Sequence, residues 1–295
     1  MAGELPPRKP SAGWQVVRRN AGRTAARFRN VRLDRIVGLY ARAATIGWRR
    51  PVARIPQPRP ERVVVSLSTI PSRVDHLRSV LHSLLDQSVP ADRIILSLPA
   101  HSARENRPYP PRSALRLPPG VDVLDCPDLG PATKLLPARA AEPGAALIVV
   151  DDDVIYPPRF IETLLMAHRK LPGAALAYRG VRLAPDRAFP DLEHDFATAV
   201  REPLPVDILF GTWGYLLPPG ALTDATGEAP SGELRWVDDV WVSGQLARRG
   251  IRRFVVAADE IPIESMNAAR RSLAGGPNRS GSNDARAIAA FASDW

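Results

Sequence analysis

Short hydrophobic runs alternate with amphipathic segments from residue 61 onward. Apolar runs rich in β-branched residues predict buried strands at 62–68, 93–98, 121–125, 146–150 and 174–178. Apolar residues at helical spacing predict helices at 71–85, 132–141, 158–170 and 237–249. Strands separated by helices of this length predict an α/β domain with a mostly parallel sheet and helices on both faces.

The rhythm loosens beyond residue 180. The segments VDILF (206–210) and GTWGYLL (211–217) predict two strands that pair as a hairpin. One more strand is expected at 252–256, after the last clear helix. The chain contains no internal repeat.

The first 60 residues have a different pattern. From 14 to 48, arginines alternate with an apolar stripe at helical spacing, formed by Leu33, Ile36, Val37, Tyr40 and Ala44. The segment 51–60 contains four prolines and is typical of a linker. The pattern therefore predicts a helical arm, 1–60, joined to one domain, 61–295.

Charge is concentrated in this arm. Residues 1–60 hold 14 Lys and Arg against 2 Asp and Glu, whereas the remainder holds 26 against 29. The near-neutral domain argues against a nucleic-acid-binding core. An Arg-rich amphipathic helix suits an anionic membrane surface. Packing against its own domain, or binding another macromolecule, are the alternatives for this helix.

Cysteine and hydropathy limit the cellular setting. Cys126 is the single cysteine of the chain, which excludes an internal disulfide and a multi-thiolate zinc site. No apolar stretch reaches the length of a membrane span, and the N-terminus lacks the apolar core of a signal peptide. We therefore expect a cytoplasmic protein, with peripheral attachment to the inner face of the plasma membrane through residues 14–48.

Three consecutive aspartates follow the strand at 146–150. In an extended segment, Asp151 and Asp153 point to the same side, where they can share one Mn²⁺ or Mg²⁺ ion together with diphosphate oxygens. The alternative is a solvated turn whose aspartates cap the next helix. Since ligands bind at the carboxyl ends of strands in open α/β sheets, this position favours a metal site.

A second acidic pair opens the helix predicted at 237–249. Asp238 and Asp239 lie in its first turn, where the helix dipole alone favours negative charge. Trp236 and Trp241 flank the pair, and an apolar wall raises the pKa of a carboxylate toward the range of a general base. Helix stabilisation and general base catalysis are both consistent with this pattern.

Three further segments are candidate binding sites. Lys134, one of only three lysines, lies beside a Gly-Pro turn. It is suited to contact a phosphate or a nucleotide base, and the alternative is a solvated lysine. Thr69 and Ser72 follow the first strand at a helix start, which is typical of nucleotide binding and equally of an N-cap. Gly211 allows close backbone approach and Trp213 offers a stacking face, for sugar binding or for core packing.

In their order along the chain, these motifs resemble those of a GT-A-fold glycosyltransferase of the bacterial family-2-like type. The order is VVVSLSTIPSR, GPATKLLP, VVDDD and VDDVWVSGQLARRG, which covers residues from about 61 to 270. The C-terminal half is also similar to exostosin-type N-acetylhexosaminyltransferases. The resemblance implies a Rossmann-like GT-A fold and transfer of a sugar from a nucleotide-diphosphate sugar to a glycan or lipid-linked acceptor.

The resemblance also implies roles for single residues. Asp153 and Asp151 would hold Mn²⁺ or Mg²⁺, Asp239 would be the catalytic carboxylate with Asp238 beside it, and Gly211 and Trp213 would contact the acceptor. The donor would be held by Thr69, Arg73, Asp128, Lys134, Asp151 and Asp152.

The late histidine that many such enzymes supply to the metal is absent, since no histidine follows His194. Glu264, Asn267 or water would replace it, and Arg279 or Arg286 would reach the diphosphate.

Two other functions fit parts of the pattern. A haloacid-dehalogenase-type phosphohydrolase also uses an Asp-x-Asp after a strand and a late acidic pair. Here, however, the first motif follows about the fourth strand, and the second opens a helix. A non-catalytic carbohydrate-binding relic of the fold is the other alternative.

Overall fold

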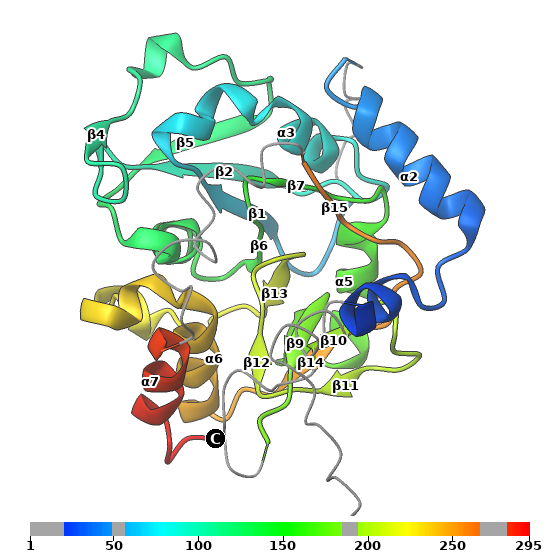
Figure 1. Ribbon diagram of the computed structural model, residues 1–295. Coiled ribbons are helices and arrows are strands. Elements are labelled where there is room, and N and C mark those ends of the chain that lie inside the picture. Colours follow the sequence, from blue (N-terminus) through cyan, green and yellow to red (C-terminus); the bar gives the residue numbers. More distant parts are fainter. Residues whose placement is uncertain (1–20, 49–56, 185–193, 266–281) are drawn as a thin grey trace, which may run out of the picture.

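The protein is described by a computed structural model over residues 21–48, 57–184, 194–265 and 282–295 (Figure 1). Its centre is one eight-stranded sheet. In spatial order the strands are β11 (Leu204–Pro205), β14 (Arg253–Val255), β8 (Ala175–Ala177), β13 (Tyr215–Leu217), β6 (Ala146–Val149), β1 (Val63–Ser68), β2 (Arg93–Leu98) and β5 (Val121–Asp125). Only β13 and β11 run antiparallel to their neighbours, so the predicted mostly parallel sheet is confirmed.

The central strands are buried on both faces, as parallel strands in α/β proteins are. Val63, Val64, Val65 and Leu67 of β1 are fully buried, and all four residues of β6 are too. This explains why the sequence shows continuous apolar runs there instead of alternation. The five strands expected from these runs all form, within about one residue of their predicted ends.

Helices cover the two faces of the sheet. α3 (Arg78–Leu85) and α5 (Phe160–Lys170) lie on one side in Figure 1, together with α2 (Leu33–Thr45). On the other side lie α6 (Asp238–Arg248) and α7 (Ser282–Ala290), which contact each other. α4 (Leu136–Ala141) follows a 3₁₀ turn, η3 (Gly130–Lys134).

Two of the predicted helices are interrupted. The segment 71–85 begins as a 3₁₀ helix, η1 (Pro71–His76), before α3, and the segment 132–141 is divided between η3 and α4. Pro71 opens η1, and Pro137 lies in the first turn of α4, which are positions where proline starts a helix. Three more 3₁₀ turns are η2 (Arg112–Ala114), η4 (Asp224–Gly227) and η5 (Gly232–Trp236).

The predicted hairpin at 206–217 is wrong. β12 (Ile208–Leu209) joins a separate three-stranded sheet with β9 (Arg179–Val181) and β10 (His194–Phe196), whereas β13 inserts between β6 and β8. The chain turns between them with Trp213 and Gly214 at φ 82° and 83°. Two-stranded pairs complete the fold: β7 (Val154–Ile155) with β15 (Ile263–Glu264), and β3 (His101–Ser102) with β4 (Arg107–Pro108).

The arm packs on the domain through one face. Residues 21–28 are helical, Asn30 breaks the helix at φ 66°, and α2 follows. Leu39 and Ile46 are buried, and Arg42 forms an ion pair of 2.6 Å with Asp86 of the domain. None of the helices described, in the arm or beyond it, has the length and apolar character of a membrane span. The boundary at residue 60 stays a prediction.

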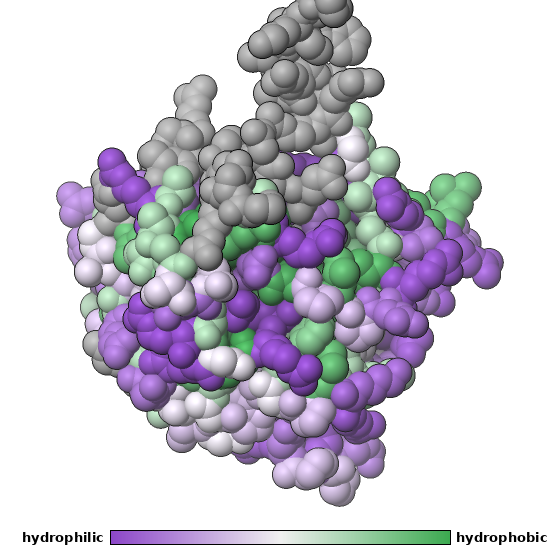
Figure 2. Space-filling model, turned by 90° about the horizontal axis from the view of Figure 1, so that it is seen from below, coloured by the Kyte–Doolittle hydropathy of each residue, from purple (hydrophilic) through white to green (hydrophobic). Residues whose placement is uncertain are grey.

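The opposite face of α2 is apolar and exposed. Leu33 is 76% exposed, Val37 61% and Tyr40 50%, and Trp48 just beyond the helix is 90% exposed. Figure 2 shows hydrophobic atoms protruding at the right-hand edge, the side on which α2 lies in Figure 1. The apolar stripe predicted from the sequence therefore lies largely on the outer surface of the arm. Other residues, Leu39 and Ile46, pack the arm against the domain.

Candidate active site

A cavity of about 670 Å³ opens at the carboxyl ends of the central parallel strands. Its walls come from the loops after β1, β5 and β6 and from the start of α6. This is where open α/β sheets bind ligands, and the volume suits a nucleotide-sized molecule. The cavity brings together nearly all of the predicted site residues: Thr69, Arg73, Asp128, Lys134, Asp151, Asp152, Asp153, Asp238 and Asp239.

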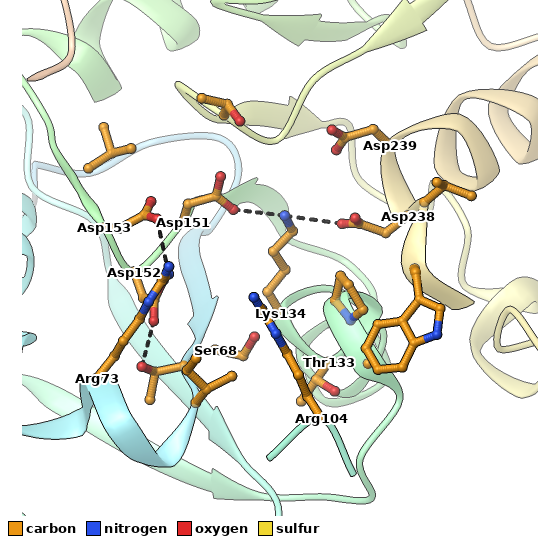
Figure 3. Close-up of a pocket in the computed structure, with 18 of the residues that line it drawn as sticks. Ser68, Arg73, Arg104, Thr133, Lys134, Asp151, Asp152, Asp153, Asp238 and Asp239 are labelled. Carbon is orange, nitrogen blue, oxygen red and sulfur yellow. Dashed lines mark hydrogen bonds and ion pairs between the residues drawn. The ribbon is translucent and has the colours of Figure 1, made fainter. Parts of the chain in front are cut away.

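Two of the three aspartates after β6, Asp152 and Asp153, are held by groups from the segment after β1 (Figure 3). Thr69 Oγ1 donates to Asp152 Oδ2 at 2.6 Å. Arg73 Nη1 donates to Asp152 Oδ1 at 2.8 Å and to Asp153 Oδ2 at 3.0 Å. Thr69 and Arg73 therefore fix the geometry of the aspartate cluster, a more specific role than the general donor contact expected of them.

Burial and mutual repulsion raise the pKa values of two of these aspartates, Asp152 and Asp153. Burial, followed by the charges of Asp151 and Asp152, raises the pKa of Asp153 to about 7. Burial also raises the pKa of Asp152, although Arg73 and Thr69 oppose this. One arginine thus does not compensate the negative charge that the chain concentrates here.

Lys134 connects this cluster to the second acidic motif. Its Nζ lies 2.8 Å from Asp151 Oδ1 and 3.1 Å from Asp238 Oδ2, and Figure 3 shows it between the two carboxylates. Burial alone would lower the pKa of this lysine, but Asp151, Asp238 and Asp239 outweigh it and raise the pKa well above its usual value. Lys134 is therefore a fixed cation and not a solvated one.

Of the two aspartates that open α6, Asp239 is the one that forms no ion pair with Lys134. Its Oδ1 accepts a hydrogen bond from the backbone N–H of Gly211 at 2.8 Å. Burial, and then the neighbouring Asp238, raises its pKa to about 8. Ser243 ties the helix to β12, since its Oγ donates to Asp239 O at 2.7 Å and accepts from Leu209 N at 2.9 Å. The result is a rigidly placed carboxylate with the affinity for protons of a general base.

The two residues predicted to contact the acceptor lie elsewhere than expected. Gly211 supports Asp239 through its N–H, and a Cβ there would come within 2.6 Å of Lys134 Nζ. Trp213 is 1% exposed, packs on Phe196 with ring centroids 5.1 Å apart, and lies outside the cavity lining. Its ring is part of the core, so it offers the cavity no stacking face.

Asp128 organises the walls of the cavity. Its Oδ1 accepts from Gly130 N at 2.7 Å and from Arg235 Nη2 at 3.0 Å, and its Oδ2 accepts from Ala103 N at 2.6 Å. One carboxylate thus joins the loop after β3, the loop after β5 and the turn before α6. These hydrogen bonds give Asp128 a structural role in the cavity wall that needs no direct contact with a ligand.

Three charged residues of the lining were missed in the sequence: Arg104, Arg179 and Asp284. Arg179 directly follows the apolar run 174–178, the same signal that identified the aspartate cluster. Arg104 lies in a Pro-rich loop and Asp284 on α7, where no periodic pattern points to a site. Burial raises the pKa of Asp284 to about 6.

The cavity suits a divalent cation shared with a ligand. Eight carboxylates and four cationic side chains line it, which leaves an excess of negative charge. Among the described residues no three His, Cys, Asp or Glu side chains are placed to hold a metal by themselves. Mg²⁺ needs no such group, because one or two carboxylates together with substrate phosphates bind it.

Of the two predicted metal ligands, Asp151 is bound to Lys134, so Asp153 together with Glu264 is better suited to that role. Both line the cavity, and Ser265 N donates to Asp153 O at 2.7 Å, which places the two chain segments side by side. The side chain of Asp153 is 20% exposed and is therefore accessible from the cavity. Asn267 and Arg279 lie outside the described residues, and Arg286 is exposed on α7 and is not one of the residues that line the cavity.

Comparison with known proteins supports the fold. No protein-family model and no curated protein matches the sequence. Among solved structures, a mannosyltransferase from Pyrobaculum calidifontis in complex with GDP-Man and Mn²⁺ matches with a TM-score of 0.51 and 17% identity, over 92% of this chain and 74% of that chain. A 4-diphosphocytidyl-2C-methyl-D-erythritol synthase matches with a TM-score of 0.46 and 10% identity, over 72% and 96%. The first likeness confirms the predicted Rossmann-like α/β fold of the GT-A type.

Proposed function

We propose that the protein is a metal-dependent glycosyltransferase that moves a sugar from a nucleotide-diphosphate sugar to a hydroxyl of a glycan or lipid-linked acceptor. One observation carries the proposal: the aspartate cluster and Asp239 face one cavity from different walls, with Lys134 between them. The fold that the chain shares with a mannosyltransferase bound to GDP-Man and Mn²⁺ supports it.

The aspartate cluster forms the donor side of the proposed site. Asp153 and Glu264 would hold Mn²⁺ or Mg²⁺, which when bound supplies positive charge to the departing diphosphate. Arg73 and Thr69 keep Asp152 and Asp153 in place, and the loop they lie on forms the wall against which the nucleotide binds. Hydrogen bonds within the protein that fix these carboxylates are the kind of preorganisation that catalysis requires.

Asp239 forms the acceptor side. Its raised pKa gives it the proton affinity to accept the hydrogen of the attacking hydroxyl, while Gly211 N and Ser243 hold its position. Asp238 remains paired with Lys134 and acts as a positioning residue. The two acids of the motif therefore divide support and proton transfer between them.

A screen of nucleotide sugars with Mn²⁺ tests this function. We expect slow, Mn²⁺-dependent hydrolysis of one donor, with release of a nucleoside diphosphate, and faster release when an acceptor is added. Release of free phosphate from phosphate esters would indicate a phosphohydrolase instead. If calorimetry detects no binding of any nucleotide sugar with Mn²⁺, the protein is a non-catalytic relic of the fold.

We further propose that the enzyme works at the cytoplasmic face of an anionic membrane, held there by α2. The exposed side chains Leu33, Val37 and Tyr40 form an apolar strip for shallow insertion, and the arm carries the excess of arginine that attracts anionic lipid. Such attachment would bring the cavity to a lipid-linked acceptor.

A further inference from the structure

Arg179 is a cation of the cavity whose charge the proposed mechanism does not use. It lies at the start of β9, lines the cavity, and forms no ion pair with a carboxylate anywhere in the ranges that the structure describes. Its Nε and Nη2 both contact His194 Nδ1, at 3.0 and 2.8 Å. By contrast, Arg73 and Lys134 are each bound to two aspartates.

The surroundings of Arg179 hold its guanidinium without neutralising it. The group lies 5.0 Å from the ring centroid of Phe210 and 5.4 Å from that of Phe196. Burial, and then Arg179 itself, lowers the pKa of His194 to about 3, so the imidazole is neutral and accepts a hydrogen bond from the arginine. His194 in turn stacks on Phe210 at 4.9 Å.

Other charges near Arg179 oppose one another. Burial lowers its pKa to about 10, and Arg23 and Arg27 of the arm act in the same direction, while Asp239 and Glu264 oppose them. Glu264 already pairs with Arg27 at 3.4 Å. Arg179 therefore stays protonated at neutral pH in a low-dielectric site, where a cation without a counter-ion is costly.

A guanidinium has five N–H donors, and His194 takes two of them. The remaining edge matches the paired oxygens of a phosphate or a carboxylate. The segment that carries Arg179 adjoins the wall of Asp239, because Phe210 N donates to Arg179 O at 3.0 Å and the next residue, Gly211, donates to Asp239, whose charge acts on Arg179. The aspartate cluster that faces the donor lies on a different strand, β6.

We propose that Arg179 is an anion subsite for the acceptor, and that the acceptor carries a phosphate or carboxylate close to the hydroxyl that reacts. This inference rests on the proposed function, whose acceptor side it specifies. Arg23 and Arg27 of the arm act electrostatically on Arg179, so positive charge is concentrated around this guanidinium although the cavity lining as a whole is acidic.

Ligand binding, measured by calorimetry on the full chain, tests this subsite without turnover. The probes are glycerol 3-phosphate, as an acceptor-like phosphate, and a nucleoside diphosphate with Mn²⁺. Arg179→Gln removes the charge, and Arg182→Gln is the matched control, since Arg182 lies just beyond the same strand and pairs with Asp195 at the surface. Arg179→Lys keeps the charge without the planar fork and tests the geometry.

We expect Arg179→Gln to weaken glycerol 3-phosphate binding about 10- to 100-fold, the value of a charge-assisted hydrogen-bonded pair. Nucleoside diphosphate binding should change less than about twofold, Arg179→Lys should bind the phosphate at an intermediate level, and Arg182→Gln should match wild type. Equal loss of both ligands would assign Arg179 to the donor diphosphate and overturn the acceptor subsite.

Phosphate binding that is absent from wild type, or unchanged in Arg179→Gln, would also overturn the subsite. Failure of the nucleoside diphosphate to bind wild type would instead count against the proposed function. If Arg179→Gln does not fold, the comparison is made between Arg179→Lys and wild type, with thermal stabilisation by glycerol 3-phosphate as the readout. A stabilisation equal in the two proteins would contradict the inference.

Discussion

At the scale of single residues, Lys134 determines how negative charge is divided across the cavity. It pairs with Asp151 on one side and with Asp238 on the other, which leaves Asp239 held by the Gly211 N–H. The two adjacent aspartates, Asp238 and Asp239, therefore have different environments. Different environments give two carboxylates different pKa values, which allows one to bind a cation and the other to accept a proton. The helical pattern could not distinguish them, because both lie in the first turn of the helix, and Asp239 was singled out by the family resemblance instead.

The first prediction concerns Asp239 as the base. Asp239→Asn keeps the acceptor for Gly211 N but cannot take up a proton. We expect the transfer rate to fall by about 10²- to 10⁴-fold, while donor affinity changes little because the nucleotide is held on the other wall. Turnover and donor affinity are measured separately, with Asp224→Asn, an exposed aspartate, as the control. A variant that loses donor affinity and keeps turnover at saturation would remove Asp239 from this role.

The same substitution should stabilise the protein at high pH. The pKa of Asp239 is about 8 in the folded protein, above its ordinary value of 3.8, so folding favours the protonated acid. Its contribution is fully present below the unfolded pKa and is lost as the pH rises through the folded pKa. Asp239→Asn avoids this loss, so its melting temperature should exceed that of wild type by an amount that grows from about pH 4 to about pH 8 and is constant above that. A difference that stays constant across the lower range as well would contradict the raised pKa.

Removing one charge from the aspartate cluster tests the metal. Asp153→Asn conserves volume and retains an oxygen for Arg73, so the fold should persist. Donor hydrolysis should fall to the level of wild type treated with EDTA, because the remaining carboxylates bind the divalent ion less well. Asp125→Asn, at the exposed end of β5, is the control. Turnover by EDTA-treated Asp153→Asn equal to that of untreated wild type would exclude a metal role for this residue.

At the scale of elements, the segment between β12 and β13 connects the two sheets and also completes the site. It turns with Trp213 and Gly214 at positive φ, so that β13 can enter the main sheet between β6 and β8. The same turn brings Gly211 beneath Lys134 and Asp239. Core packing and the geometry of the candidate site therefore constrain one short loop.

This constraint predicts the effect of a single methyl group. In Gly211→Ala the Cβ would meet Lys134 Nζ at 2.6 Å and Asp239 Oδ1 at 3.0 Å. Lys134 is fixed by two ion pairs, so either it or the loop must move, and a displacement of about 1 Å in a site costs up to about 10²-fold in rate. We expect lower turnover with an unchanged circular dichroism spectrum. Gly144→Ala, where a Cβ meets nothing within 4 Å, should behave as wild type.

The elements also show what could be predicted from the sequence. Fully buried strands such as β1 and β6 were found because burial on both faces produces continuous apolar runs. Asp151–Asp153 were found because they follow β6, and Asp239 was found because it lies in the first turn of a predicted helix. Trp213 was misplaced because a tryptophan in a glycine-rich loop looks the same whether it faces a cavity or the core, and that depends on distant partners such as Phe196.

At the scale of the whole molecule, the arm belongs to the surface that surrounds the cavity. Arg27 pairs with Glu264 of the cavity lining and lies 5.2 Å from the ring centroid of Trp213. Leu39 and Ile46 fill part of the core. Deleting the arm would therefore expose buried surface and disturb the site, so substitutions on the outer face of α2 are the better test of membrane attachment.

The membrane hypothesis predicts a response to two substitutions on that face. The full-length protein should sediment with vesicles rich in anionic lipid, and less so as salt increases, because arginine–lipid attraction is screened. Leu33→Ser combined with Val37→Ser removes two exposed apolar side chains, each worth about 1.5–3 kcal/mol on full burial, so partitioning should fall at least about tenfold. Met166→Ser, at an exposed apolar site on α5, should have no effect. Because all three side chains face solvent, donor hydrolysis should survive in every variant; vesicle binding that is absent from wild type, or retained in the double variant, would show that the arm serves only to complete the domain.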